Sequence, residues 1–196
     1  MRLYIFFYLL ITIFSKAVFA NFVNKIGSVD SGYAPNDIPF FDLDGKKHYL
    51  DECDSKVCLV VFWASWHGSH GKQIEQLDNL KKDFKKLPFE IIMVSEDFEG
   101  SDHIKALFKK YEIKNISPYH DMNNKLFNAF GVNSLPLAFL INDSGERVLK
   151  FSGEFNWCLD DIRNQILSFI SGSYAIPRNS CYKDSMNIKI KDEKEK

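Results

Sequence analysis

The sequence predicts one α/β domain in which a central mixed β-sheet has helices on both faces. Runs of apolar, β-branched residues have the length of strands, and amphipathic segments with helical spacing separate them. The last two predicted strands are joined by a short turn, which makes that pair antiparallel. Strands that alternate with helices are typical of a sheet covered by helices, and the closing hairpin makes the sheet mixed.

The composition excludes an intrinsically disordered chain and a nucleic-acid-binding protein. The chain has 196 residues, of which 45% are hydrophobic, so it is long and apolar enough to form a core. Its formal net charge is −1, whereas a protein that binds nucleic acid is expected to carry a basic excess. We therefore expect a folded domain with no nucleic-acid partner.

The first 20 residues have the pattern of a signal peptide. Arg2 precedes an apolar run, Leu3–Phe14, and the small residues Val18 and Ala20 occupy the favoured cleavage positions. The run is short for a membrane span, and the alternative is an uncleaved anchor. In either case the domain is expected to be exported, and contact with a membrane is expected only through an uncleaved signal.

The first half of the predicted domain begins after a short linker, residues 21–33. Two short apolar runs within Ala34–Glu52 flank Asp44-Gly45, a typical hairpin turn. Val57–Ala64 is almost continuously apolar, which predicts a strand buried on both faces.

Two helices and a second buried strand follow. His70–Leu87 has apolar residues at helical spacing with lysines between them, and it predicts an amphipathic helix lying on the sheet. Phe89–Asp97 predicts the strand. Ser101–Ile113 predicts the second helix, with Ser101 as its N-cap.

The rest of the domain completes the sheet. Asn123–Val132 predicts a short helix that ends at Gly131. A strand, its hairpin partner and a final helix are predicted over Leu135–Asn142, Glu146–Gly153 and Trp157–Ile170. The domain therefore covers residues 34–172, and the polar residues 173–196 are expected to form a disordered tail.

Three stretches carry a resemblance to a known family: "DLDGKKHYLDE", "VVFWASW" and "GVNSLPLAFLINDSGERV". Over residues 34–172 the chain resembles the TlpA/ResA branch of the thioredoxin superfamily, whose members are exported thiol–disulfide oxidoreductases related to redoxins. The resemblance implies a thioredoxin-like fold and a cis peptide bond before Pro136. It also implies location in the periplasm, either free or anchored to the inner membrane.

The chain departs from the family at its redox centre. Where the resemblance implies Cys-x-x-Cys, the sequence has His67-Gly68-Ser69-His70. Exchange needs an attacking thiolate and a second thiol, and imidazole forms no mixed disulfide. Many members carry a glutamate three residues further on, but here Gln73 does not titrate. We therefore expect dithiol activity to be absent, which leaves open whether the chain is an enzyme.

A binding role is the leading hypothesis. The resemblance implies a groove between the active-site turn and the cis-proline that binds an extended peptide through strand-like hydrogen bonds. Trp66, Leu135 and Pro136 are expected to line this groove, which does not depend on thiols. The expected partner is a protein or an extended peptide.

Metal binding is the second hypothesis. His67 and His70 lie three residues apart at the predicted start of a helix, so they are expected on one face, where they can share copper or zinc. Two histidines leave a zinc site incomplete, and His103, His120, Asp97 or a group in the Pro136 loop would have to complete it. Otherwise no cofactor is expected.

Residual thiol–disulfide exchange is the third hypothesis. Cys53, Cys58, Cys158 and Cys181 can pair in three ways in an oxidising compartment. Cys53 is either free or bridged to Cys58, and Cys158 can pair with Cys181. Cys58 begins its predicted strand, roughly 16 Å from the end at which catalytic thiols belong.

Overall fold

A computed structural model describes residues 26–29, 32–53, 56–68, 70–98, 100–170 and 179–182. The predicted signal peptide (1–20) and residues 183–196 of the predicted tail lie outside the described residues. Within the described ranges, no helix has the length and apolar character needed to cross a membrane.

An eight-stranded mixed sheet forms the centre of the domain, in the order β1-β8-β7-β4-β5-β6-β2-β3. β4 pairs in parallel with β5 and antiparallel with β7. The strands are β1 (Ile26–Ser28), β2 (Phe40–Asp42), β3 (Lys47–His48), β4 (Val57–Trp63), β5 (Phe89–Ser95), β6 (Pro118–His120), β7 (Leu137–Ile141) and β8 (Arg147–Ser152). The mixed sheet confirms the predicted fold class.

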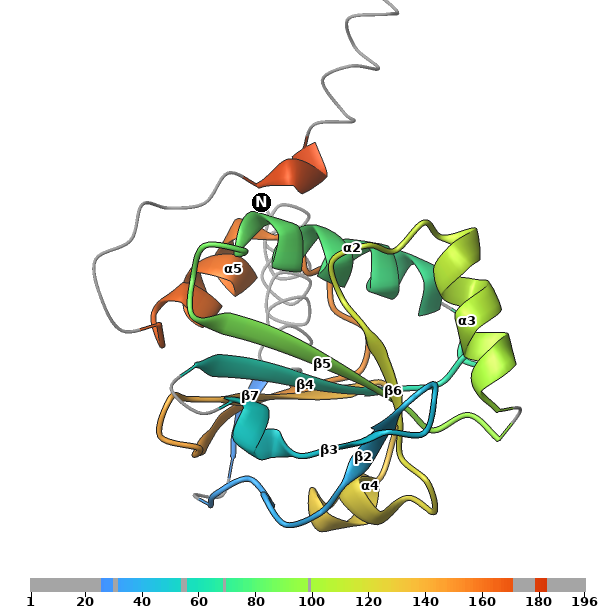
Figure 1. Cartoon of the computed structure of the whole chain (residues 1–196). Helices are drawn as coiled ribbons and strands as arrows, with labels where there is room; N and C mark the ends of the chain where they lie inside the picture. Colours follow the sequence, from blue (N-terminus) through green and yellow to red (C-terminus); the bar gives the residue numbers. More distant parts are fainter. Residues whose placement is uncertain are drawn as a thin grey trace, which may run out of the picture.

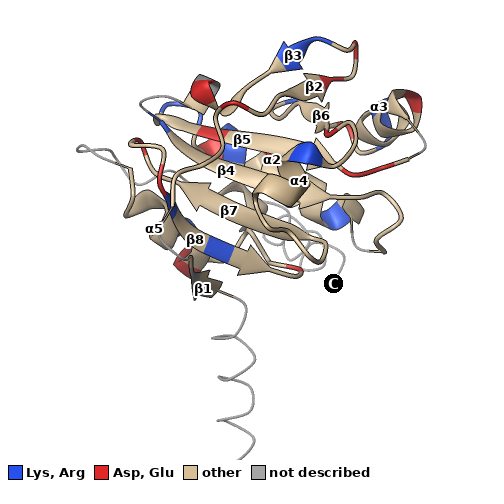
Figure 2. Cartoon of the chain, turned by 90° about the horizontal axis from the view of Figure 1, so that it is seen from below, with Lys and Arg blue, Asp and Glu red and all other residues tan. Residues whose placement is uncertain are grey.

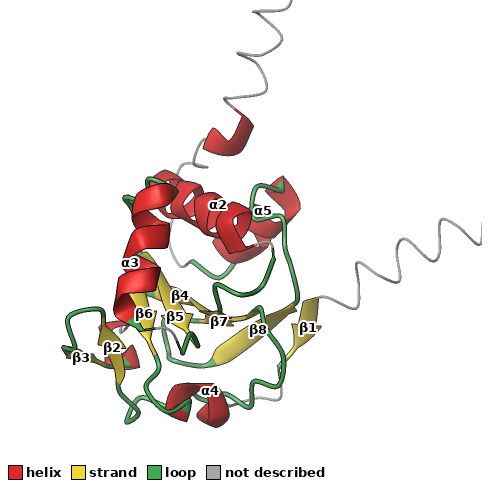
Figure 3. Ribbon diagram, turned by 90° about the vertical axis from the view of Figure 1, so that its right-hand side faces the viewer, coloured by secondary structure: helices red, strands yellow, loops and turns green. Residues whose placement is uncertain are grey.

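Helices cover both faces of the sheet (Figure 1). One face carries α2 (His70–Asp83), α3 (Ser101–Lys110) and α5 (Asp160–Leu167), and the other carries α4 (Lys125–Ala129) (Figure 3). Each face has its own core cluster: Ile74, Leu77 and Ile162 belong to the first, and Phe62 and Leu126 to the second.

Strand β4 is buried along its whole length, as its apolar sequence predicts. Neither β4 nor β7 contains a Lys, Arg, Asp or Glu, and both are uniformly tan in Figure 2. Because β4 and β5 are parallel, their carboxyl ends meet at one edge of the sheet. In open α/β sheets this edge is where ligands bind.

Two strands correct the sequence-based predictions. β1 lies inside the segment predicted as a linker, 21–33, and pairs antiparallel with β8. β6 lies between two predicted helices, where no strand was predicted, and it pairs with β5 and β2. Each strand has three residues, too few to show a period of two, and each owes its conformation to hydrogen bonds from its neighbours.

The start of α3 also differs from the prediction. Gly100 occupies the N-cap position with a φ of +85°, and no side chain caps the helix. Ser101 is the first helical residue instead. Glycine adopts this positive φ without steric cost, so the helix begins after a glycine turn and without a hydroxyl cap.

The four cysteines form two disulfides, Cys53–Cys58 and Cys158–Cys181. Cys53 and Cys58 are buried at the amino end of β4. Cys158 precedes α5, and its partner lies in a 3-10 turn, Ser180–Tyr182. These are the pairings that the sequence left open.

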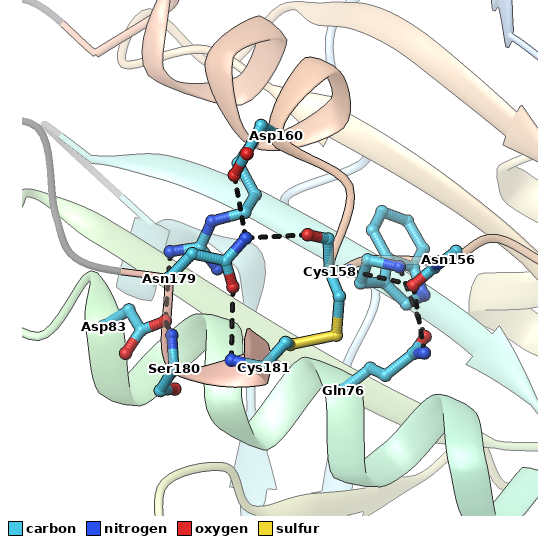
Figure 4. Close-up of a disulfide and its surroundings, with 10 residues drawn as sticks. Gln76, Asp83, Asn156, Cys158, Asp160, Asn179, Ser180 and Cys181 are labelled. Carbon is cyan, nitrogen blue, oxygen red and sulfur yellow. Dashed lines mark hydrogen bonds and ion pairs between the residues drawn. A yellow bond between two sulfur atoms is a disulfide. The ribbon is translucent and has the colours of Figure 1, made fainter. Parts of the chain in front are cut away.

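The described part of the C-terminal segment, 179–182, lies beside α2 and α5, where a disulfide and hydrogen bonds hold it (Figure 4). The Asn179 amide donates to the Cys158 carbonyl at 2.7 Å. The Asp83 carboxylate accepts from the Ser180 N–H at 2.8 Å and from the Arg163 guanidinium at 3.0 Å. Ordered structure therefore extends into the segment predicted as a disordered tail.

Candidate functional site: a cleft beside cis-Pro136

The loop after β4 brings the two histidines to the carboxyl edge of the sheet. The His67 N–H donates to the Ala64 carbonyl at 3.3 Å, which closes a turn before α2 begins at His70. His67 therefore lies in the turn and not on the helix, which corrects the expectation that both histidines share a helix face. Trp66, at the tip of this loop, is 65% exposed.

The imidazoles have different neighbours. His70 Nδ1 lies 2.7 Å from the His67 carbonyl oxygen. Because a carbonyl only accepts, Nδ1 of His70 carries the proton in this contact and Nε2 is the acceptor of the neutral ring. His67 Nδ1 lies 3.5 Å from the Glu154 carboxylate. Both side chains are thus engaged with the protein.

A small cleft lies between the histidines and a cis peptide bond. The Leu135–Pro136 bond is cis, as the resemblance implies. The cleft is lined by residues of β4, α2, β5 and the Pro136 segment, among them His67, His70, Gln73, Met93, Pro136 and Trp157. Its volume is about 20 Å³, enough for roughly one water molecule. Of the predicted groove residues, Pro136 lines this cleft, whereas Trp66 and Leu135 do not.

Gln73 joins α2 to the segment before α5. Its amide nitrogen donates to the Phe155 carbonyl at 2.7 Å, and its oxygen accepts from the Trp157 indole N–H at 2.8 Å. One side chain must therefore donate and accept at once, which glutamine does and an ionised glutamate does not. Trp157 was not among the predicted site residues, although a buried indole N–H usually needs an acceptor.

The predicted metal ligands are not gathered around His67 and His70. Among the described residues, no group of three or more His, Cys, Asp or Glu side chains is placed to hold a metal ion. His120 Nε2 instead lies 3.0 Å from the Asp97 carbonyl oxygen, beside a second pocket. Copper or zinc binding by the two histidines stays a prediction.

The second pocket is acidic and was not expected from the sequence. It opens where β5 and β6 end, and Glu96, Asp97, His120 and Asp121 line it together with neighbouring residues. Its volume is about 240 Å³. The pairing of β5 with β6 brings Glu96 and Asp121 together, although they lie far apart in the sequence.

Asp97 connects this pocket to the histidine loop. Its carboxylate accepts from the Ser65 N–H at 2.9 Å and from the Ser65 hydroxyl at 2.6 Å. The Ser95 hydroxyl donates to the other oxygen at 2.6 Å. Because Ser65 directly precedes Trp66, these bonds fix the loop that carries the cleft residues.

Glu96 is the unusual member of the acidic pocket. Only 6% of its surface is exposed, and neither carboxyl oxygen accepts a hydrogen bond from a described residue. Burial raises the pKa of Glu96 to about 8, and repulsion from Asp121 and Asp97 adds to the rise.

Comparison with known proteins agrees with this architecture. Residues 54–147 match a family model described as thioredoxin-like. The thiol-disulfide oxidoreductase ResA of Bacillus cereus is 31% identical over 121 residues, which are 62% of this chain and 68% of the relative. The chain belongs to the ResA-like family of thiol-disulfide oxidoreductases. Within this family, it carries His67 and His70 where the sequence resemblance implies the two thiols.

Solved structures show the same fold. A thiol:disulfide interchange protein DsbE of Chlorobium tepidum has a TM-score of 0.65 at 20% identity, covering 74% of this chain and 100% of that chain. The exposed lipoprotein thioredoxin of Streptococcus pneumoniae has a TM-score of 0.58 at 22% identity, covering 67% of this chain and 98% of that chain.

Replacing Gln73 tests its bridging role. Gln73→Glu is expected to lower the free energy of unfolding at pH 7 by about 1–3 kcal/mol, because a carboxylate cannot donate to the Phe155 carbonyl. At about pH 4 the loss is expected to shrink, since the carboxyl then recovers a proton. Urea unfolding at both pH values measures it, with Gln165→Glu on α5 as the matched control. Equal stability of Gln73→Glu and the wild type at pH 7 would contradict the bridge.

Glu96 is expected to make stability depend on pH. Its pKa is about 8 in the folded protein against an ordinary value of 4.5, so the folded state holds more protons than the unfolded state between these pH values. The free energy of unfolding is therefore expected to fall as pH rises, by at most about 1.4 kcal/mol per pH unit. Glu96→Gln should remove this contribution, whereas Glu75→Gln at an exposed position of α2 should not.

Thermal or urea unfolding at pH 5, 6.5 and 8 measures the difference between the wild type and each variant. The Glu96→Gln variant should gain stability relative to the wild type as the pH rises. If the difference in unfolding free energy between Glu96→Gln and the wild type stays constant across the three pH values, Glu96 is not a buried carboxyl group with a raised pKa.

Proposed function

We propose that the protein is an exported member of the ResA-like family that binds an extended segment of a partner protein without dithiol exchange. The observation that carries the proposal is the cleft itself. It is lined by residues of β4, α2 and cis-Pro136, as the resemblance implies for an exchange site, and His67 and His70 occupy the positions implied for the thiols. Recognition by such a site needs the cleft, and exchange needs the thiols.

The backbone beside the cleft supports strand-like binding. Neither the N–H nor the C=O of Leu135 forms a hydrogen bond with another described residue, whereas the Pro136 carbonyl accepts from the Gly153 N–H at 2.9 Å. Unpaired backbone groups at such an edge can pair with an extended chain. Trp66, which directly precedes the cleft residue His67, is exposed and offers an apolar contact.

The positions of the cysteines argue against exchange at this cleft. All four are paired, and none lines it. Cys58 is the second residue of β4, and the cleft is formed by the other end of that strand. Residual exchange by these cysteines stays a prediction, as does release into the periplasm or retention at the inner membrane.

A thiol-free probe separates recognition from chemistry. The insulin B chain, with its cysteines alkylated, offers an extended polypeptide that cannot exchange disulfides. The wild-type protein is expected to bind a fluorescently labelled form of it, as measured by anisotropy. Leu135→Lys should weaken binding about tenfold or more, because the bound chain would bury an unpaired charge.

Leu159→Lys is the matched control, since Leu159 is exposed and lies at the start of α5 rather than next to Pro136. It is expected to bind like the wild type. The proposal fails if the wild type does not bind the probe, or if Leu135→Lys binds it as tightly as Leu159→Lys does.

A further inference from the structure

The acidic pocket at the ends of β5 and β6 is distinct from the cleft. Asp97 and Asp121 have partners for their oxygens: Ser65 and Ser95 donate to Asp97, and backbone N–H groups at the start of α4 donate to Asp121. These bonds explain why both aspartates are buried. They also leave the two carboxylates as neighbours of Glu96.

The burial of Glu96 is not explained by hydrogen bonds of this kind. Glu96 is only 6% exposed and lines the pocket. Neither of its carboxyl oxygens has a hydrogen-bond donor among the described residues. A buried polar group without a partner destabilises a fold, and neighbouring carboxylates increase that cost. A cationic donor in the pocket would satisfy the oxygens of Glu96 and offset the repulsion from Asp97 and Asp121.

The rim of the pocket indicates what kind of cation fits. Phe98 is 88% exposed and Met122 is 49% exposed, and both line the pocket beside its acidic residues. An apolar rim over an acidic floor suits a long side chain with an alkyl stem and a charged end. An aromatic ring also attracts ammonium and guanidinium groups. The volume of about 240 Å³ holds such a side chain and far exceeds that of a bare metal ion.

We propose that this pocket binds a lysine or arginine side chain of the polypeptide that pairs with the backbone beside Pro136. The proposal rests on the proposed function and names one feature of its partner. Both sites lie where β4 and β5 end, and the Asp97–Ser65 hydrogen bonds join the pocket to the loop that carries Trp66 and His67. A segment crossing this edge therefore meets an apolar cleft and an acidic pocket.

A matched pair of probes tests the pocket. The first is the alkylated insulin B chain with an acetylated amino terminus. The second is the same chain with its arginine replaced by citrulline and its lysine by norleucine, which removes both charges and keeps the stems. At physiological ionic strength, the wild type is expected to bind the basic probe about tenfold more tightly than the neutral one.

Glu96→Gln is expected to reduce this preference below about threefold and to leave the affinity for the neutral probe unchanged. Glu75→Gln is the same substitution at an exposed position and should keep the full preference. Met122→Lys is a second variant at a partly exposed position, chosen because its own ammonium group can occupy the pocket. It should also abolish the preference.

The outcomes separate the two proposals. If neither probe binds the wild type, the proposed function fails. If both bind equally well, or if Glu96→Gln and Met122→Lys keep the wild-type preference, the cleft stands and the basic-side-chain pocket is wrong. Calcium binding to the protein alone, measured by calorimetry and lost in Glu96→Gln, would identify a metal site instead and overturn the proposal.

Discussion

The burial of β4 on both faces determines how the strands and helices of the domain are arranged around it. Because every residue of this strand is buried, it must pair on both sides and be covered by helices above and below. Its parallel pairing with β5 then fixes one edge of the sheet as the place where the following loops gather. Both the histidine cleft and the acidic pocket lie at that edge.

Two side chains convert this edge into a defined site. Asp97, after β5, binds Ser65, after β4, and so sets the loop that carries the histidines. Gln73, on α2, binds both Phe155 and Trp157 and so closes the cleft from the side of α5. The position of Gln73 thus holds a neutral side chain that donates to one segment and accepts from the other.

Most of the fold follows from sequence patterns, because β4 and β5 are apolar runs of strand length and α2 and α5 are long enough to show helical spacing. The cis bond before Pro136 was predicted from the family resemblance alone. What the sequence did not reveal depends on long-range contacts. The short strands β1 and β6 exist because neighbouring strands pair with them, and the Gln73–Trp157 bond joins residues 84 positions apart. The acidic pocket needs the β5–β6 pairing before Glu96 meets Asp121.

We propose that the chain keeps the scaffold of an exchange site and that His67 and His70, in place of two thiols, abolish disulfide exchange. The most direct test is insulin reduction by dithiothreitol in the presence of the wild type or of the double variant His67→Cys/His70→Cys. The wild type is expected to give the uncatalysed rate, and the double variant is expected to form a new disulfide and accelerate the reaction. A catalytically active wild type, or a double variant whose new disulfide forms but does not exchange, contradicts the claim.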